Sequence, residues 1–187
     1  MDAVFPDMAF AKYFIGTAVI PSDMVLKGSA DIRNDSISAL LGLTQDEGAI
    51  NLNAGFIPKT ESFFAKMDIN ELNIHNFMPS DSLFRVTASL MAEGKGFDIF
   101  SPTTKMGMEA GISCFEYARY SFSGINMKAG LENCKSSVAL NINDNTMEIG
   151  STLNADISAK EIAAQMRTDI KLSLIHISEP TRLGMIS

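Results

Sequence analysis

The chain has 187 residues, 46% of them hydrophobic and only 20% charged, with a formal net charge of −7 at pH 7. This balance excludes a disordered chain and argues against a protein whose main partner is nucleic acid. The length suits about one domain with a sizeable core, and no apolar run approaches the roughly 20 residues that a helical membrane span needs.

Residues 1–23 differ in pattern from the rest of the chain. Apolar residues are too dense between Ala3 and Phe14 for alternation, so we expect an irregular or short helical segment here. The segment lacks the basic region, apolar stretch and small-residue cleavage site of a secretory signal. We expect the chain to be an internal piece of a longer protein, and this lack then does not indicate where the parent protein resides.

Residues 24–171 are expected to form one continuous β-repeat array without a domain boundary. Apolar and polar residues alternate with period two, which predicts half-buried strands separated by turns such as Asn34–Asp35 and Asp144–Asn145. In the first half of the array the apolar positions are Met24, Leu26, Ala30, Ile32, Ile37, Ala39, Leu41, Leu43, Ile50, Leu52, Ala54, Phe56, Phe63, Ala65, Met67, Ile69, Phe84, Val86, Ala88, Leu90 and Ala92.

The alternation is most regular in the second half of the array. Because alternate residues of a strand point to one face, the apolar positions are predicted to share one face of a sheet. The other face carries Lys, Glu, Asp, Asn, Ser and Thr. The larger apolar positions are Met106, Met108, Ile112, Ile125, Met127, Leu131, Val138, Leu140, Ile142, Met147, Ile149, Leu153, Ile157, Ile162, Met166 and Ile170.

One stretch between the runs departs from alternation. The segment Glu71–Met78 reads ELNIHNFM and predicts either a single helical turn or a bulged crossing between two strands.

The predicted fold is all-β: a long antiparallel meander of about ten strands with at most one short N-terminal helix. Its apolar face can be covered by closure into a barrel, by folding into a β-sandwich, or by curling into an elongated open groove. A β-sandwich is the common solution. The open, taco-like groove is favoured if the chain is a slice of a longer repeat.

Residues 172–187 are expected to be a non-native tail. The stretch Leu172–Arg182 reads LSLIHISEPTR, with a proline and no clear period. It is similar, codon for codon, to the translation of a transposase adapter used to prepare DNA sequencing libraries. Residues translated from an adapter are not part of the natural protein, so they do not contribute to the predicted fold.

The rest of the sequence shows no motif of an active site or a metal centre. P-loop, GxSxG, HExxH and CxxC patterns are absent from it. His75 is the one histidine outside the tail, and it is interpreted as a packed or surface residue. Cys114 and Cys134 could form a disulfide only if their strands are neighbours. We therefore expect neither catalysis nor a cofactor.

Methionine is frequent, with 12 in the chain, and several lie on the apolar stripes. Methionine fills irregular gaps in ordinary cores. Its flexible thioether also suits a surface that accommodates varied acyl chains, and the composition leaves both interpretations open.

The stretch Ser82–Lys171 resembles the translocation and assembly module family TamB of Gram-negative bacteria, within the AsmA-like superfamily. The matching elements are a TASLMAEGKG strand, a D-x-F-x-P step and the phrase FEYARYSFSGINMKA, followed by strands that end in short Asn/Asp turns. Upstream, IRNDSISALLGL, NLNAGFIPKT and LNIHNFMPSDSL fit the same pattern, so the resemblance covers Met24–Lys171.

The resemblance implies a specific function. Such proteins are anchored in the inner membrane by an N-terminal segment and cross the periplasm as a long curled sheet with a continuous apolar groove. They are thought to move phospholipid towards the outer membrane and are linked to the insertion of outer-membrane proteins. We therefore expect phospholipid acyl chains as ligands along the apolar positions. An outer-membrane assembly protein of the TamA or BamA type is expected to bind parts of the parent protein that lie outside this chain.

Two other functions stay open. In one, the array is a scaffold whose free edge strand pairs with client proteins by strand addition. In the other, the chain is an enzyme built on a β-sandwich, for which a cleft of converging carboxylates would be the sign. The sequence offers no residues that support the enzyme.

Overall fold

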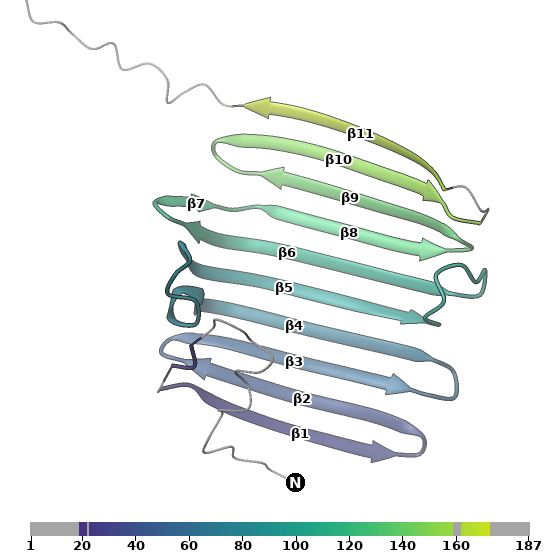
Figure 1. Ribbon diagram of the computed structural model, residues 1–187, viewed down its shortest axis with the longest axis horizontal. Helices are drawn as coiled ribbons and strands as arrows, with labels where there is room; N and C mark the ends of the chain where they lie inside the picture. Colours follow the sequence, from purple (N-terminus) through teal and green to yellow (C-terminus); the bar gives the residue numbers. More distant parts are fainter. Residues whose placement is uncertain (1–18, 22, 159–161, 173–187) are drawn as a thin grey trace, which may run out of the picture.

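The computed structural model describes residues 19–21, 23–158 and 162–172. They form one antiparallel sheet of 11 strands, which follow one another in chain order across the sheet (Figure 1). Strands β1 and β11 stand at opposite ends of this order, so the sheet stays open over the described residues. The predicted all-β antiparallel meander is confirmed, in its open form rather than as a β-sandwich. The helix expected between Ala3 and Phe14 lies outside the described residues, as do residues 173–187 of the expected tail.

The main path of the sheet leaves out only the short strand β7, which pairs with β6 alone. The strands are β1 (Val25–Arg33), β2 (Ser36–Gln45), β3 (Gly48–Ile57), β4 (Ser62–Asn73), β5 (Leu83–Lys95), β6 (Lys105–Tyr117), β7 (Tyr120–Phe122), β8 (Ile125–Glu132), β9 (Lys135–Asn143), β10 (Met147–Asp156) and β11 (Ala163–Leu172).

Two-residue turns join several neighbouring strands. Asn34 and Asp35 both have positive φ angles, of 49° and 62°, between the paired residues Arg33 and Ser36. Positive φ at both central positions gives a hairpin turn whose twist matches that of the flanking strands, and Asn and Asp tolerate this conformation best after glycine. The predicted turn at Asn34–Asp35 is thus present in the structure.

The segment between β4 and β5 contains both of the features predicted as alternatives. The pairing of β4 with β5 shifts register between Ile69 and Leu72, which marks a β-bulge. Glu71 adopts a φ of 49° in this bulge and donates its N–H to Thr87 Oγ1 at 3.0 Å. The extra residue keeps Leu72 on the same face as Ile69, where it is buried.

A single 3₁₀ turn, η2 (Ile74–Asn76), follows directly after the bulge. Asn73 caps it, since its side-chain oxygen accepts a hydrogen bond from the His75 N–H at 3.2 Å. The His75 ring lies 4.9 Å from the ring of Phe84, and its Nδ1 lies 2.9 Å from the carbonyl oxygen of Asp81. His75 is therefore a packed residue that fixes the crossing from β4 to β5.

Candidate functional site

The pairing register arranges apolar side chains in rows that cross the strands. Residues directly opposite each other in an antiparallel pair point to the same face, so each chain of partners defines one row. The isoleucine row contains Leu26, Leu43, Ile50, Ile69, Ala88, Ile112, Ile125, Ile142, Ile149 and Ile170, one residue from each strand of the main path. This row is apolar from one end of the sheet to the other.

Three further rows run beside the isoleucine row on the same face. The leucine row contains Gly28, Leu41, Leu52, Met67, Leu90, Ala110, Met127, Leu140, Ser151 and Thr168. The alanine row contains Ala30, Ala39, Ala54, Ala65, Ala92, Met108, Ala129, Val138, Leu153 and Met166. The aromatic row contains Ile32, Ile37, Phe56, Phe63, Gly94, Met106, Leu131, Ser136, Ala155 and Ala164. Together the four rows form the apolar face.

The apolar face has no second layer of described residues packed against it. Among the described residues, Leu72 and Cys134 are the only buried hydrophobic residues. A domain of this size that folds around a closed core buries most of the surface that its unfolded chain exposes. The side chains of the apolar face are instead half-buried by their own neighbours or exposed, which leaves one side of each available for contact with a ligand.

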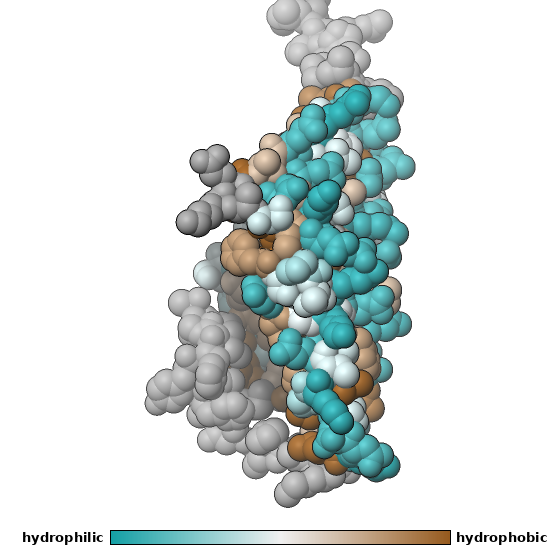
Figure 2. Space-filling model, turned by 90° about the vertical axis from the view of Figure 1, so that its right-hand side faces the viewer, coloured by the Kyte–Doolittle hydropathy of each residue, from teal (hydrophilic) through white to brown (hydrophobic). Residues whose placement is uncertain are grey.

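Hydrophilic side chains predominate on the opposite face, as the edge-on view of the sheet shows (Figure 2, right-hand side), and Leu40, Phe64 and Met91 are exposed exceptions there. Oppositely charged residues lie directly across from each other there, with Lys128 Nζ 2.9 Å from Glu109 Oε1 and Lys105 Nζ 3.0 Å from Glu132 Oε1. These pairs are exposed and each contributes little to stability. They fix this face as the solvated one, because an apolar ligand would have to desolvate them.

One loop folds back over an end of the apolar face. Phe97, between β5 and β6, stacks on Phe63 with ring centroids 5.4 Å apart and lies 5.7 Å from the ring of Phe56. Thr104, at the other end of the loop, is buried and donates its hydroxyl to the Asp98 carbonyl oxygen at 2.7 Å. The loop therefore covers the aromatic row over β3 to β5.

A second aromatic group lies at the other end of β6. Phe115 and Phe122 are directly paired with ring centroids 5.8 Å apart, and Tyr117 pairs with Tyr120. The guanidinium of Arg119 lies 5.4 Å from the centre of the Tyr120 ring. The aromatic residues of this group extend the apolar face beyond the isoleucine row, and the sequence analysis did not include them, although Phe115–Tyr117 and Tyr120–Phe122 each alternate.

The structure brings most of the sequence-predicted site residues together on the apolar face. Met147, opposite Leu172, lies two residues before Ile149 on β10, and so faces the same side as the rows. Ile157 and Ile162 lie outside the strands, in the connection between β10 and β11. The other predicted positions fall in the four rows: Met106, Met108, Ile112, Ile125, Met127, Leu131, Val138, Leu140, Ile142, Ile149, Leu153, Met166 and Ile170.

The predicted site covered only half of this face. Strands β1 to β5 contribute half of every row, and their alternating apolar positions were predicted to lie on this face, but the predicted site began at Met106. At the other end, Ser151 and Thr168 interrupt the leucine row, and their hydroxyl oxygens are 2.9 Å apart. Each hydroxyl partners the other, so the interruption costs the face little of its apolar character.

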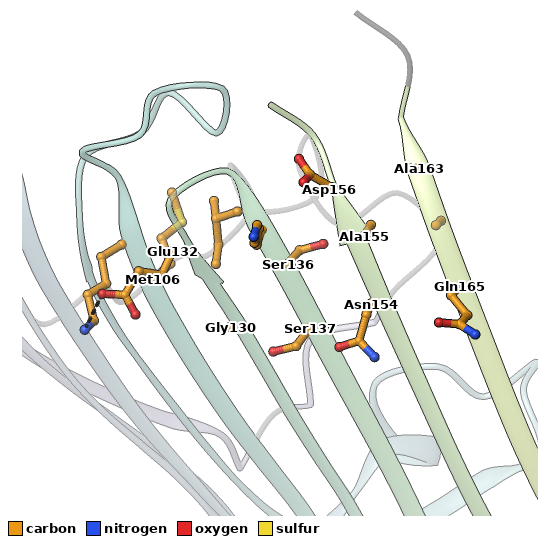
Figure 3. A pocket seen from close by; sticks show the side chains of 14 residues that line it. Met106, Gly130, Glu132, Ser136, Ser137, Asn154, Ala155, Asp156, Ala163 and Gln165 are labelled. Atoms are coloured by element: carbon orange, nitrogen blue, oxygen red, sulfur yellow. Dashed lines mark hydrogen bonds and ion pairs between the residues drawn. The ribbon is translucent and has the colours of Figure 1, made fainter. Parts of the chain in front are cut away.

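One depression of the surface, with a volume of about 740 Å³, lies at the end of strands β6 and β8 to β11 where Glu132 pairs with Lys105, and residues of both faces line it. Ser137, Asn154 and Gln165 lie side by side within it on β9, β10 and β11 (Figure 3). Glu132 at its rim is paired with Lys105, and Asp156 accepts hydrogen bonds from Ser158. The two carboxylates of this lining, Glu132 and Asp156, are thus each already partnered.

The two cysteines are both free thiols. Cys134 follows β8 at the end where Glu132 pairs with Lys105, and its Sγ donates to the Phe100 carbonyl oxygen at 3.1 Å. Cys114 lies nine residues farther along β6 from Lys105, which places it about 30 Å away at the usual strand rise. A disulfide between them, which the sequence left open, is excluded by this separation.

In the part of the chain that the structure describes, no group of three or more His, Cys, Asp and Glu side chains is placed to hold a metal ion. None of its helical segments is long and apolar enough to cross a membrane.

No protein-family model, no curated protein and no solved structure matches the chain. The arrangement of residues on the sheet is therefore the basis for a functional proposal.

Proposed function

We propose that this chain is part of a periplasmic bridge that conducts phospholipid between the inner and outer membranes, with the acyl chains lying against the apolar face. The observation that carries the proposal is that four apolar rows run across the open sheet without a second layer of described residues over them. The resemblance of Ser82–Lys171 to the TamB family supports the same function. The parent protein would be anchored in the inner membrane.

The energetics of acyl chains fit such a face. Transfer of each CH₂ group of a lipid tail from water to an apolar environment is favourable by about 0.8 kcal/mol. A row such as Ile112, Ile125 and Ile142 supplies that environment without a polar interruption. Because neighbouring strands offer nearly the same side chains, a tail meets no single position that holds it much more tightly than the next.

The direction of the rows sets the direction of movement. The rows cross the strands, from β1 to β11, over about 43 Å at the usual spacing between strands. A lipid that follows them moves perpendicular to the strands. Further strands of the parent protein would supply the rest of the path between the two membranes. The lipid headgroup would stay at the rim of the sheet, in water.

A scaffold function is the second candidate, and one specific observation favours it. Strands β1 and β11 each have one edge without a partner strand among the described residues. Such edges bind extended segments of other proteins by adding a strand, which is how a factor for outer-membrane protein assembly could hold its clients. This function uses the edges and leaves the apolar face unoccupied.

A photo-crosslinking amino acid at Met127 or at Lys128 distinguishes these functions. Met127 lies on the leucine row, whereas Lys128 is its neighbour on the polar face and pairs with Glu109. Each variant is mixed with phospholipid vesicles, irradiated and analysed by mass spectrometry. We expect phospholipid adducts at residue 127 and none at residue 128.

The same pair of variants can overturn the proposal. If neither position captures phospholipid, the apolar face does not bind acyl chains, and the scaffold function takes the place of lipid conduction. Equal capture at both positions would mean that lipid associates with the sheet without using its apolar face, which also contradicts the proposal.

A further inference from the structure

The hairpin of β6 and β7 extends beyond the isoleucine row and changes from apolar to polar towards its tip. Phe115 and Phe122 come first, with ring centroids 5.8 Å apart, and Tyr117 lies opposite Tyr120 one step farther out. The turn that joins the two strands contains Arg119. Apolar rings, phenol hydroxyls and a guanidinium therefore follow one another within one hairpin.

The rings of this hairpin lie on the same side of the sheet as the apolar face. Phe115 lies opposite Val86, which is two residues from Ala88 of the isoleucine row and so points to the same side. Tyr117 is two residues from Phe115, and the residues of β7 directly opposite share its face. Tyr117 and Tyr120 are 47% and 55% exposed. Such tyrosines suit a boundary where the ring contacts hydrocarbon and the hydroxyl stays in water.

Arg119 is a cation without an acidic partner among the residues that the structure describes. Its guanidinium lies 5.4 Å from the centre of the Tyr120 ring, and Nη2 donates to the Tyr120 hydroxyl at 3.3 Å. Arg85, by contrast, lies 3.1 Å from a carboxylate oxygen of Glu71 and 3.9 Å from one of Glu116. A guanidinium carries five N–H donors in a planar fork that matches a phosphate, so the tip of the hairpin has the donors to bind one.

We propose that Arg119, with the hydroxyls of Tyr117 and Tyr120, binds the phosphate of a phospholipid headgroup while the acyl chains extend along β6 and β8 over the apolar face. This inference rests on the proposed function and adds which end of the strands takes the headgroup. One tail occupies about 15 Å in a leaflet, half of a bilayer core of roughly 30 Å. The five-residue step from Phe115 to Ala110 covers about 17 Å at the usual strand rise, so a tail ends near Ala110 and its partner Met127.

The opposite ends of the strands carry more lysines, but these lysines belong to the polar face. Lys95, Lys105 and Lys135 each adjoin a residue of the aromatic row in sequence, so their side chains point the other way. The loop after β5 also lies over the aromatic row at that end, with Phe97 stacked on Phe63. A phosphate whose tails lie on the apolar face therefore meets Arg119 rather than these lysines.

A competition between two lipids with the same acyl chains tests this site. The chain with a photo-crosslinker at residue 127 is mixed with detergent micelles that hold equal amounts of phosphatidylglycerol and of diacylglycerol, which lacks the phosphate. After irradiation, mass spectrometry gives the ratio of the two adducts. We expect phosphatidylglycerol to be captured roughly tenfold more often, and the two lipids to be captured within about twofold of each other in Arg119→Gln. Tyr120→Phe keeps the ring but deletes a hydroxyl, so its ratio should lie between these values.

Lys95→Gln is the matched control, because it removes the same charge from an exposed residue at the other end of β5 and should leave the ratio unchanged. Capture of neither lipid by the unaltered chain contradicts lipid conduction, and this inference with it. Equal capture of both lipids, or a preference that survives in Arg119→Gln, overturns the headgroup site alone. So does a preference that Lys95→Gln removes, or one that inorganic phosphate abolishes at the concentration of the lipid, since the site would then take free phosphate.

Discussion

Phe97, in the loop after β5, stacks on Phe63 of β4 with an angle of 17° between the rings. The stack is possible because Gly94, opposite Phe63 in the sheet, has no side chain. A Cβ atom on Gly94 would lie 2.8 Å from Phe63 Cζ and 2.7 Å from the Lys105 carbonyl oxygen. One glycine on the apolar face thus allows the loop that follows β5 to cover the aromatic row over β3 to β5.

Gly94→Ala should therefore destabilise the sheet. The new methyl group meets a backbone oxygen that cannot move without shifting β6, and overpacking of this kind costs about 1–3 kcal/mol. The measurement is the midpoint of urea unfolding, followed by far-ultraviolet circular dichroism. Gly107→Ala on β6 is the control, because a Cβ atom there meets nothing within 4 Å. A loss of stability at residue 107 equal to that at residue 94 would contradict the explanation by close contact.

The two thiols should differ in reactivity and should not form a disulfide with each other. Cys134 is buried and donates to the Phe100 carbonyl oxygen, whereas Cys114 is partly exposed on β6. We expect a maleimide reagent to modify Cys114 at least about tenfold faster than Cys134 under native conditions, because burial limits access to the thiol. Peptide mapping after timed labelling measures both rates. An intramolecular disulfide between the two cysteines after mild oxidation would mean that the strand order is wrong.

Alternation was sufficient to predict the strands and their faces. The runs around Met127 and Leu140 have strict period two, and the structure pairs these two residues on the apolar face. Adjacent pairing follows from short turns between consecutive strands, so a meander was the simplest topology. Strand β7 (Tyr120–Phe122) was missed because its three residues, although they alternate, are too few to show a period.

Contacts between distant segments could not be predicted from the sequence. Nothing in the segment Gly96–Thr104 indicates that Phe97 folds back onto β4, since that depends on the space left by Gly94. The bulge and the 3₁₀ turn between β4 and β5 were proposed as alternatives. Both are present because the bulge at Glu71 corrects the face of Leu72 before the turn η2 begins.

Acid should weaken the turn between β9 and β10 through Asp144. The N–H and the hydroxyl of Thr146 donate to its carboxylate, as do those of Ser123, and these hydrogen bonds hold the pKa of Asp144 below its usual range. A lowered pKa in the folded state means that the charged carboxylate stabilises the fold above the unfolded value, near pH 4. That contribution is lost as the pH falls through the folded pKa.

Removal of the Thr146 hydroxyl tests whether these hydrogen bonds lower the pKa of Asp144. Thr146→Val keeps the shape of the side chain but deletes one donor, so the pKa of Asp144 should rise towards its usual range. A nuclear magnetic resonance titration of the Asp144 carboxyl carbon reports this directly. In Asp144→Asn, unfolding midpoints should depend less on pH below about pH 4 than in the original chain. An unchanged titration in Thr146→Val would refute the assigned cause.

A negative charge on the apolar face should prevent lipid capture, whereas the same charge one residue away should not. Leu140 and Ala139 are neighbours on β9 that point to opposite faces: Leu140 pairs with Met127, and Ala139 pairs with Lys128. Leu140→Asp puts a carboxylate where an acyl chain would lie, and a buried unpaired carboxylate is strongly unfavourable. We expect lipid capture by a photo-crosslinker at residue 127 to fall roughly tenfold.

Ala139→Asp introduces the same charge beside Lys128, where the two groups attract each other in water, so capture at residue 127 should stay within about twofold. Both variants need equal circular dichroism spectra and equal unfolding midpoints before their yields of phospholipid adduct at residue 127 are compared. If Ala139→Asp reduced capture as much as Leu140→Asp, the effect would come from the net charge of the chain rather than from the face. Capture that survives in Leu140→Asp would mean that the tails lie elsewhere on the sheet.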